Sequence, residues 1–176
     1  MTTMASTTIR MAWALAALCA ALAFVGAQAA ECPPPGFDSA KDFNISAWVD
    51  HPWYIQRMMP VFYLPEDSFY CVRASYEQVS DDTVEVSNVA REGSVDGKES
   101  GGDMTLNANI PDLDDPSKLR VGPAFLPPSL YGQYWVVFAG GENAPEEYDY
   151  GIVSGGPPTL QSGDACIAGT PADVVS

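Results

Sequence analysis

Few side chains in this sequence have a type and spacing that could do chemistry on their own. The single histidine, His51, could sense pH, but a lone histidine in a loop is more often simply solvated. The acidic run Asp112-Leu113-Asp114-Asp115 lacks the glycine and the closing glutamate of a calcium-binding loop. No nucleophile elbow, phosphate-binding loop or metal-binding helix motif is present. The sequence therefore predicts no catalytic residue, no metal site and no cofactor.

The cysteines are the remaining reactive groups. Cys19 lies in an apolar leader, which leaves Cys32, Cys71 and Cys166. An odd number allows at most one bridge within the chain. We predict a disulfide between Cys71, in a strand pattern, and Cys166, near the end of the chain; the alternative is that Cys32, or all three, lack a partner. A metal site is the weaker interpretation, because there is one histidine and no Cys-x-x-Cys pair.

Residues 1–30 are predicted to be a signal peptide rather than part of the fold. Arg10 is the only charge before Glu31, Met11–Ala27 is apolar, and small residues follow up to Ala30. The apolar run is too short and alanine-rich for a membrane span, which needs ~20 strongly apolar residues. An uncleaved anchor and an organelle transit sequence are the alternatives. We expect a secreted protein without stable membrane insertion after cleavage, or a plastid-lumen protein if the organism is photosynthetic.

The chain after residue 30 is strongly acidic. It contains all 23 acidic residues and seven of the eight basic ones, since Arg10 lies in the leader, so its formal net charge is −16. Such a surface repels nucleic acids and anionic membranes, and neither is expected as a partner. About 146 residues remain, which is the length of one domain with a single core.

Short β-like segments separated by turn residues fill most of this domain. They are predicted over residues 53–62, 69–76, 83–89, 103–110, 118–121, 133–138 and 148–154. Residues 31–42 form a proline-rich N-terminal strap, residues 43–156 the strand domain, and residues 157–176, rich in Gly, Pro and Ser, a coil tail. No amphipathic helix longer than two turns is predicted, so the expected fold class is all-β.

The segment Asp42–Gln56 carries the most specific pattern. It reads as one short helical turn, then a break at Asp50-His51-Pro52, because proline disfavours helix in the residue before it, and then a strand that begins with Trp53-Tyr54. This arrangement resembles the opening signature of the lipocalins, small barrels that carry apolar ligands. By that resemblance Trp53 has a structural role and closes the floor of the barrel.

Further segments in the same order strengthen the resemblance. Tyr70–Tyr76 is similar to the cysteine-containing second strand of lipocalins related to apolipoprotein D and the bacterial lipocalins, and Val84–Asn88 to their third strand. Residues 118–121 and 131–137 are similar to the fifth and sixth strands. Tyr148-Asp149-Tyr150 falls where the family has its second signature. The resemblance covers about residues 42 to 156 and implies an antiparallel up-and-down β-barrel.

Two departures from the family pattern imply an incomplete barrel. His51 stands where the first signature has a glycine two residues before its tryptophan. Nothing after Gly155 supplies the family's eighth strand or C-terminal helix, and no Arg or Lys occurs beyond Arg120 to stack on the first-strand tryptophan. We therefore expect a truncated chain of about seven strands with two unpaired sheet edges.

Side-chain alternation along the strands predicts which residues face the interior. If Cys71 points outward, the opposite face of its strand looks into the barrel, and the same period of two selects residues of the fifth and sixth strands. Such a pocket suits a flat or elongated apolar ligand with one polar end near a tyrosine hydroxyl; the alternative is a packed core without a cavity. The predicted ligand-binding residues are Val72, Ala74, Tyr76, Leu119, Val121, Tyr134, Val136 and Phe138.

The resemblance leaves more than one function open. The first is a lipocalin-like protein that binds or transports a small hydrophobic ligand such as a lipid, pigment or carotenoid. The second is an enzyme similar to the violaxanthin de-epoxidases, with Tyr76 or Tyr134 acting on a xanthophyll, although three cysteines after the leader do not provide the Cys-rich domain of those enzymes. The third is a non-functional fragment. We expect the binding protein; the sequence does not specify an oligomeric state.

Overall fold

The computed structural model describes residues 31–59, 66–102 and 104–169. The predicted signal peptide, the end of the first predicted strand and residues 170–176 lie outside these ranges. Among the described residues, none of the helices has the length and apolar character needed to cross a membrane.

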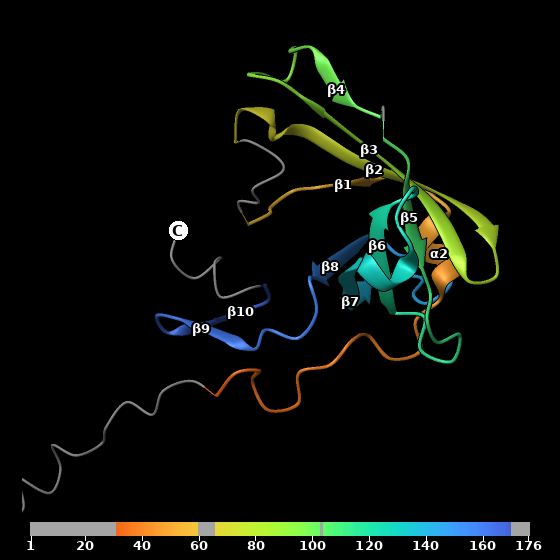
Figure 1. The fold of residues 1–176 in the computed structure, drawn as a ribbon, viewed down its shortest axis with the longest axis vertical. Helices are drawn as coiled ribbons and strands as arrows, with labels where there is room; N and C mark the ends of the chain where they lie inside the picture. The colour runs from red at the N-terminus through yellow and green to blue at the C-terminus, as the bar shows by residue number, and fades with distance from the viewer. Residues whose placement is uncertain (1–30, 60–65, 103, 170–176) are drawn as a thin grey trace, which may run out of the picture. The chain divides into compact units, whose positions relative to one another are not determined.

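One antiparallel sheet dominates the structure (Figure 1). Its hydrogen-bonded order is β1-β2-β3-β5-β6-β7-β8, and β4 pairs with β3 outside this path. Apart from β4, neighbouring strands of the path are consecutive along the chain. This is an up-and-down topology. The strands are β1 (Trp53–Tyr54), β2 (Tyr70–Ser80), β3 (Thr83–Arg91), β4 (Glu99–Gly101), β5 (Leu106–Asn109), β6 (Lys118–Pro123), β7 (Gly132–Gly140) and β8 (Tyr150–Ser154).

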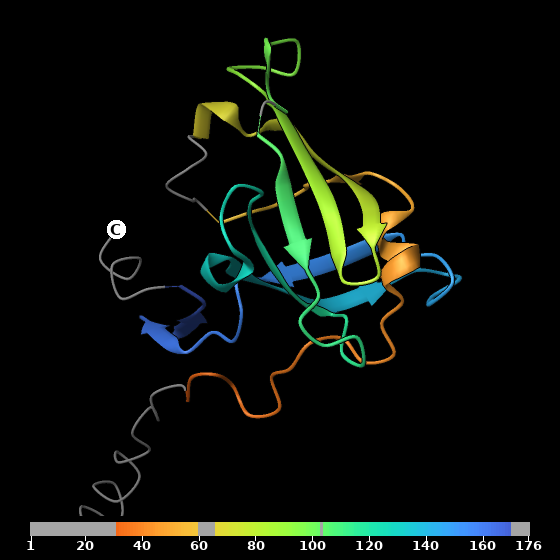
Figure 2. The same cartoon turned by 45° about the vertical axis from the view of Figure 1, so that its right-hand side comes forward.

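The sheet curls into an open half-barrel (Figure 2). β2, β3 and β5 run along one wall, and β7 and β8 cross behind them at a steep angle. The curl follows from the right-handed twist of strands, which accumulates from one neighbour to the next. Among the described residues β1 and β8 end the path and do not pair with each other. The prediction of an all-β, incompletely closed up-and-down sheet is confirmed.

Most predicted strands are present with shifted ends. β1 has two residues, and the described chain after it, residues 55–59, is not strand. β4 was not predicted; it forms a short side pairing with the end of β3. Two 3₁₀ turns, η1 (Glu66–Ser68) and η2 (Pro128–Leu130), lie in the connections before β2 and β7.

Helix α2 (Ile45–Val49) lies at one end of the half-barrel (Figure 2). Asn44 starts it, because its side-chain oxygen accepts a hydrogen bond from the Ala47 N–H at 3.3 Å. The helix ends at Val49, with Asp50 as its C-cap, just before His51-Pro52, as predicted from the proline. The helix is too short to be stable alone, so its buried residues must hold it against the sheet.

The hydrophobic core lies between α2 and the two walls of the half-barrel. Val84 on β3 and Val136 on β7 have no exposed surface, so side chains from both walls meet in one cluster. The buried members are Phe43, Ala47, Trp48, Val84, Val86, Ala108, Ile110, Leu119, Val136 and Tyr148.

The strap is bound to the sheet through its last residues. The Ala40 N–H donates to the Val136 carbonyl at 2.8 Å, and the Ser117 hydroxyl donates to the hydroxyl of the buried Ser39 at 2.9 Å. Lys118 on β6 forms ion pairs of 2.9 Å with both Asp38 and Asp115. The strap therefore adds polar contacts along β6 and β7.

This ion-pair network predicts a loss of stability in acid. Hydrogen bonds from Lys41 and Lys118 lower the pKa of Asp38, and a hydrogen bond from Lys118 lowers the pKa of Asp115. A carboxyl group with a lowered folded-state pKa stabilises the fold above its unfolded pKa of about 4, and this contribution is lost as the pH falls through the folded pKa. Lys118→Met should therefore lower the melting temperature at neutral pH, and its difference from wild type should shrink below about pH 4.

Thermal unfolding followed by circular dichroism between neutral and acidic pH measures this effect. The pairs are partly exposed, so the effect is small and decreases with added salt. Lys98→Met is the control, because Lys98 is exposed and forms none of the ion pairs among the described residues. If the difference in melting temperature between Lys118→Met and wild type did not change with pH, the ion pairs would not stabilise the fold in the way described.

The tail contains a strand pair that was not predicted. β9 (Leu160–Ser162) and β10 (Ala165–Ile167) form a separate two-stranded antiparallel sheet. Gly163 in the connecting turn has a φ of +58°, which glycine adopts without strain. The predicted coil over residues 157–176 is therefore wrong at residues 160–167. Three-residue strands are too short to produce a recognisable alternation.

Candidate ligand-binding site

Seven of the eight residues predicted to face the interior are buried or half-buried. Three of them have at most 7% of their surface exposed, and four are half-buried. The three buried residues are Ala74, Leu119 and Val136, and the four half-buried ones are Val72, Tyr76, Val121 and Tyr134. Their contact with a ligand stays a prediction.

Phe138 points away from the core. Its side chain is 45% exposed and stacks on Tyr150 of β8, with 5.9 Å between ring centroids. The register shifts between Val136 and Phe138, because β7 has one extra residue there, and Ala139 packs against the core instead. The prediction that Phe138 faces the interior is wrong, since a bulge reverses the alternation that the sequence suggests.

The structure brings two tyrosine hydroxyls from opposite walls together. Tyr76 on β2 and Tyr134 on β7 are hydrogen-bonded at 3.0 Å between their hydroxyl oxygens. Burial raises the pKa of Tyr76, and it raises the pKa of Tyr134 well above its ordinary value. Both groups therefore stay protonated at neutral pH and act as hydrogen-bond donors.

Trp48 of α2 adds a third donor to this pair. The residue is 3% exposed, and its indole Nε1 is fully buried. Burial has the larger effect on the pKa of Tyr76 and Tyr134, and hydrogen bonding by the Trp48 indole N–H opposes it by lowering both pKa values, so the N–H lies beside the two hydroxyls. We refer to Trp48, Tyr76 and Tyr134 as the donor cluster. It contains three donor hydrogens, and the bond between the two hydroxyls uses one of them.

Trp53 packs against Trp48 of the donor cluster. Its ring stacks on Trp48 with 4.2 Å between centroids, and its Nε1–H donates to the Trp48 carbonyl at 2.8 Å. It also pairs with Ala74 of β2, so it connects the end of α2 to the sheet. Trp48 is the more deeply buried of the two, and sequence reasoning missed it. A five-residue helix has too few turns to show which side faces the core.

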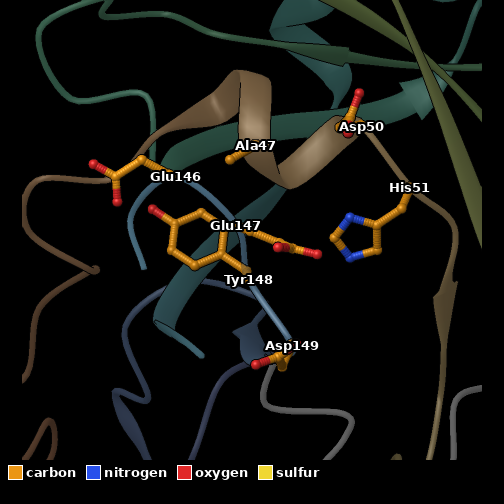
Figure 3. A pocket seen from close by; sticks show the side chains of 7 residues that line it. All are labelled: Ala47, Asp50, His51, Glu146, Glu147, Tyr148 and Asp149. Carbon is orange, nitrogen blue, oxygen red and sulfur yellow. The ribbon is translucent and has the colours of Figure 1, made fainter. Parts of the chain in front are cut away.

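A cavity of about 530 Å³ lies beside α2 (Figure 3). Its lining is mostly acidic: Ala47, Asp50, His51, Glu146, Glu147, Tyr148 and Asp149. The His51 ring and the Glu147 carboxylate point into the same hollow (Figure 3). His51 also packs on Trp53, with 4.7 Å between ring centroids. Among the described residues, no group of three or more His, Cys, Asp or Glu side chains is arranged to hold a metal ion.

The second cavity, about 230 Å³, lies around Cys71 and is lined by Tyr54, Cys71, Arg73, Val89, Ala90, Arg91 and Glu99. Neither of the two cavities contains a residue predicted to bind ligand. The half-buried tyrosines are instead packed against the core cluster.

The disulfide joins Cys32 to Cys166, with 5.5 Å between their Cα atoms, and Cys71 is free and exposed. The predicted Cys71–Cys166 pairing is therefore wrong. Cys32 lies in the strap and Cys166 in β10, and both segments lie outside the main sheet. Their closeness depends on how the two ends fold back, which spacing along the sequence does not reveal.

No protein-family model, curated protein or solved structure matches this chain. The fold and the site define its class without such a match: an all-β protein whose antiparallel sheet curls into an open half-barrel, compatible with a lipocalin-like fold.

The raised pKa values predict a late step in a base titration. The unfolded-state pKa of tyrosine is about 10. Because burial raises the folded-state pKa of Tyr76 and Tyr134, their contribution to stability is complete below pH ~10 and is lost as the pH rises through the folded pKa. Ultraviolet absorbance of phenolate should show a step above pH ~10 that coincides with unfolding.

Tyr134→Phe should reduce this late step. Tyr150→Phe, which removes an exposed hydroxyl outside the donor cluster, should leave it unchanged. Titration of all tyrosines in one step near pH 10 would show that the pair is not buried as described.

Proposed function

We propose that this protein is a secreted, lipocalin-like binding protein that holds a small hydrophobic molecule against the inner face of its half-barrel. The donor cluster is the observation that carries the proposal. Tyr76 and Tyr134 place polar hydroxyls at the border of an apolar interior, where Val121 and Leu106 are also half-buried. An apolar surface with a few convergent polar groups is typical of sites for small ligands.

The same geometry favours binding over catalysis. A xanthophyll de-epoxidase-like reaction would need a group that gives or takes a proton near neutral pH. Burial raises the pKa of both hydroxyls, which moves them further from neutral pH. The tyrosines are therefore suited to hold a polar atom of a ligand and poorly suited to transfer protons.

Displacement of a fluorescent apolar probe, Nile red, tests the proposal. We expect the purified protein to bind the probe saturably, and a fatty acid, a retinoid or a xanthophyll to displace it. Val121→Arg, which places a charge on the inner face, should weaken binding at least about tenfold, because the desolvated charge costs more than a kcal/mol. Ile152→Arg is the matched control, because Ile152 is 59% exposed on β8.

Two outcomes would contradict the proposal. Equal binding by the two arginine variants would mean that the probe is not on the inner face. No saturable binding together with a non-cooperative melt would favour a non-functional fragment.

A further inference from the structure

We propose that a second site, on the outer face of the sheet, binds a small free oxyanion such as a carboxylate or a phosphate between Arg73 and Arg91. The site is the cavity of about 230 Å³ around Cys71. This cavity contains no residue of the donor cluster, so the inference is independent of the proposed function.

The strand register places the two arginines on one face of the sheet. Arg73 on β2 is the Cα partner of Val89 on β3, and Arg91 lies two residues further along β3. Residues that are two apart on a strand share a face, and so do residues directly opposite each other. Ala74 and Ala90, the neighbours of the arginines in the chain, are at most 7% exposed and belong to the core. Both arginine side chains therefore lie on the outer face.

Four strands contribute to the cavity. Tyr54 of β1 is the Cα partner of Arg73, and Glu99 of β4 is the Cα partner of Arg91. The volume is below the ~300–1,000 Å³ that is typical of sites for drug-sized ligands. A carboxylate or phosphate with few further atoms matches this volume better than a lipid or a pigment.

The cavity lining is positively charged in a strongly acidic chain. The chain has 23 acidic and eight basic residues, yet two of the basic ones line this cavity with one carboxylate, that of the exposed Glu99. All ion pairs among the described residues involve a lysine, so neither arginine is paired in the described part of the chain. The lining thus has a formal charge of +1, which attracts an anion locally against the field of the whole chain.

Arg73 also has a hydrogen-bond donor without a partner. Its Nε is buried and has no acceptor among the described residues. Such groups are uncommon, because burial removes their bond to water. Arg91 donates from Nη1 to the Gly97 carbonyl at 3.3 Å and keeps its other donors. A guanidinium presents its donors as a planar fork that matches the oxygens of a carboxylate or a phosphate. An oxyanion that inserts beside Arg73 would supply the missing acceptor.

The arginine Nε–H resonances of the ¹⁵N-labelled wild-type protein test the proposal without any variant. Inorganic phosphate or acetate, added at constant ionic strength, should shift the resonances of Arg73 and Arg91 saturably and slow the exchange of the Arg73 Nε–H with water. Arg57 and Arg120 are internal controls, because they are exposed and outside the cavity lining. If all four resonances respond alike, the cavity does not bind the anion.

The matched variants are Arg73→Gln and Arg120→Gln, which remove the same charge inside and outside the cavity. Arg73→Gln should weaken phosphate binding, followed at the Arg91 resonance, at least about tenfold, because charge-assisted hydrogen bonds are lost. Arg120→Gln should bind phosphate like wild type. Equal affinities of the two variants would overturn the proposal.

The thiol of Cys71 provides a second measurement inside the cavity. Its thiolate displaces iodide from iodoacetate, an anion, and from iodoacetamide, a neutral molecule of nearly the same size, and peptide mass spectrometry quantifies the products at Cys71 alone. The ratio of the two rates cancels any change in the reactivity of the thiol itself. Arg73→Gln should lower the ratio of iodoacetate to iodoacetamide at least about threefold, and Arg120→Gln should not. An unchanged ratio in Arg73→Gln would contradict an anion site at Cys71.

Vesicles that contain phosphatidylglycerol distinguish a free anion from a lipid headgroup. A chain with a net charge of −15 should not sediment with them. Sedimentation that Arg73→Gln abolishes, without any effect of free phosphate or acetate on the arginine resonances, would overturn the assignment to a small free oxyanion.

Discussion

Replacing Trp48 by alanine should lower the free energy of unfolding by about 3–5 kcal/mol. Trp48 is 3% exposed and joins α2 to the core. It stacks on Trp53 at 4.2 Å between ring centroids and lies 5.6 Å from Phe43 and 6.3 Å from Tyr148. Alanine would remove most of these contacts and leave a cavity that the surrounding strands can fill only in part. Small domains have a total stability of ~5–15 kcal/mol, so the variant would lose a large part of it.

Denaturant unfolding of wild type and Trp48→Ala measures this difference. Phe125→Ala is the control, because Phe125 is 78% exposed and its replacement should change stability by no more than ~0.5 kcal/mol. Trp48→Phe should fall between the two, since it keeps a ring in the core. A loss below ~1 kcal/mol for Trp48→Ala would mean that α2 does not close the core in solution.

Removing the disulfide should have the second largest effect. The bridge between Cys32 and Cys166 spans 134 residues. Closing so long a loop restricts the unfolded chain strongly, and the loss of a native disulfide typically costs ~2–5 kcal/mol. The effect has a second source in this protein, because the strap reaches the sheet through Ala40 and Ser39. Without the bridge, the strap and the β9–β10 pair lose their covalent connection.

The experiment compares Cys71→Ser with the triple serine variant that also lacks Cys32 and Cys166. The Cys71→Ser background prevents exchange between the free thiol and the bridge during unfolding. Cys71→Ser itself should unfold like wild type, because Cys71 is exposed and unpaired. Reducing agent should lower the unfolding midpoint of Cys71→Ser to that of the triple variant. Equal midpoints with and without reductant would show that the bridge does not stabilise the fold.

The sequence predicted the fold class and most strand positions, because both depend on local patterns. Alternation along β6 predicted that Leu119 points inward, and the structure buries it in the core. Pro52 set the end of α2. These predictions required only the conformational preferences of neighbouring residues.

The errors have a different origin. Phe138 was misplaced by a bulge, which adds one residue opposite β8 without any periodic signal. The β9–β10 pair was missed because its strands have only three residues. The disulfide was assigned to the wrong partner because distance in the chain says little about distance in the fold when both cysteines lie outside the main sheet.

The candidate site depends both on local sequence patterns and on the tertiary packing. The sequence by itself determined that Tyr76 and Tyr134 lie on the inner faces of their strands, since alternation fixes the face. Only the tertiary structure decided that their hydroxyls meet at 3.0 Å and that the Trp48 indole lies beside them. The physical reason is that the curl of the sheet and the docking of α2 bring together residues from three separate elements. The curl and the docking both depend on the packing of the whole core, and no single segment of the sequence contains that information.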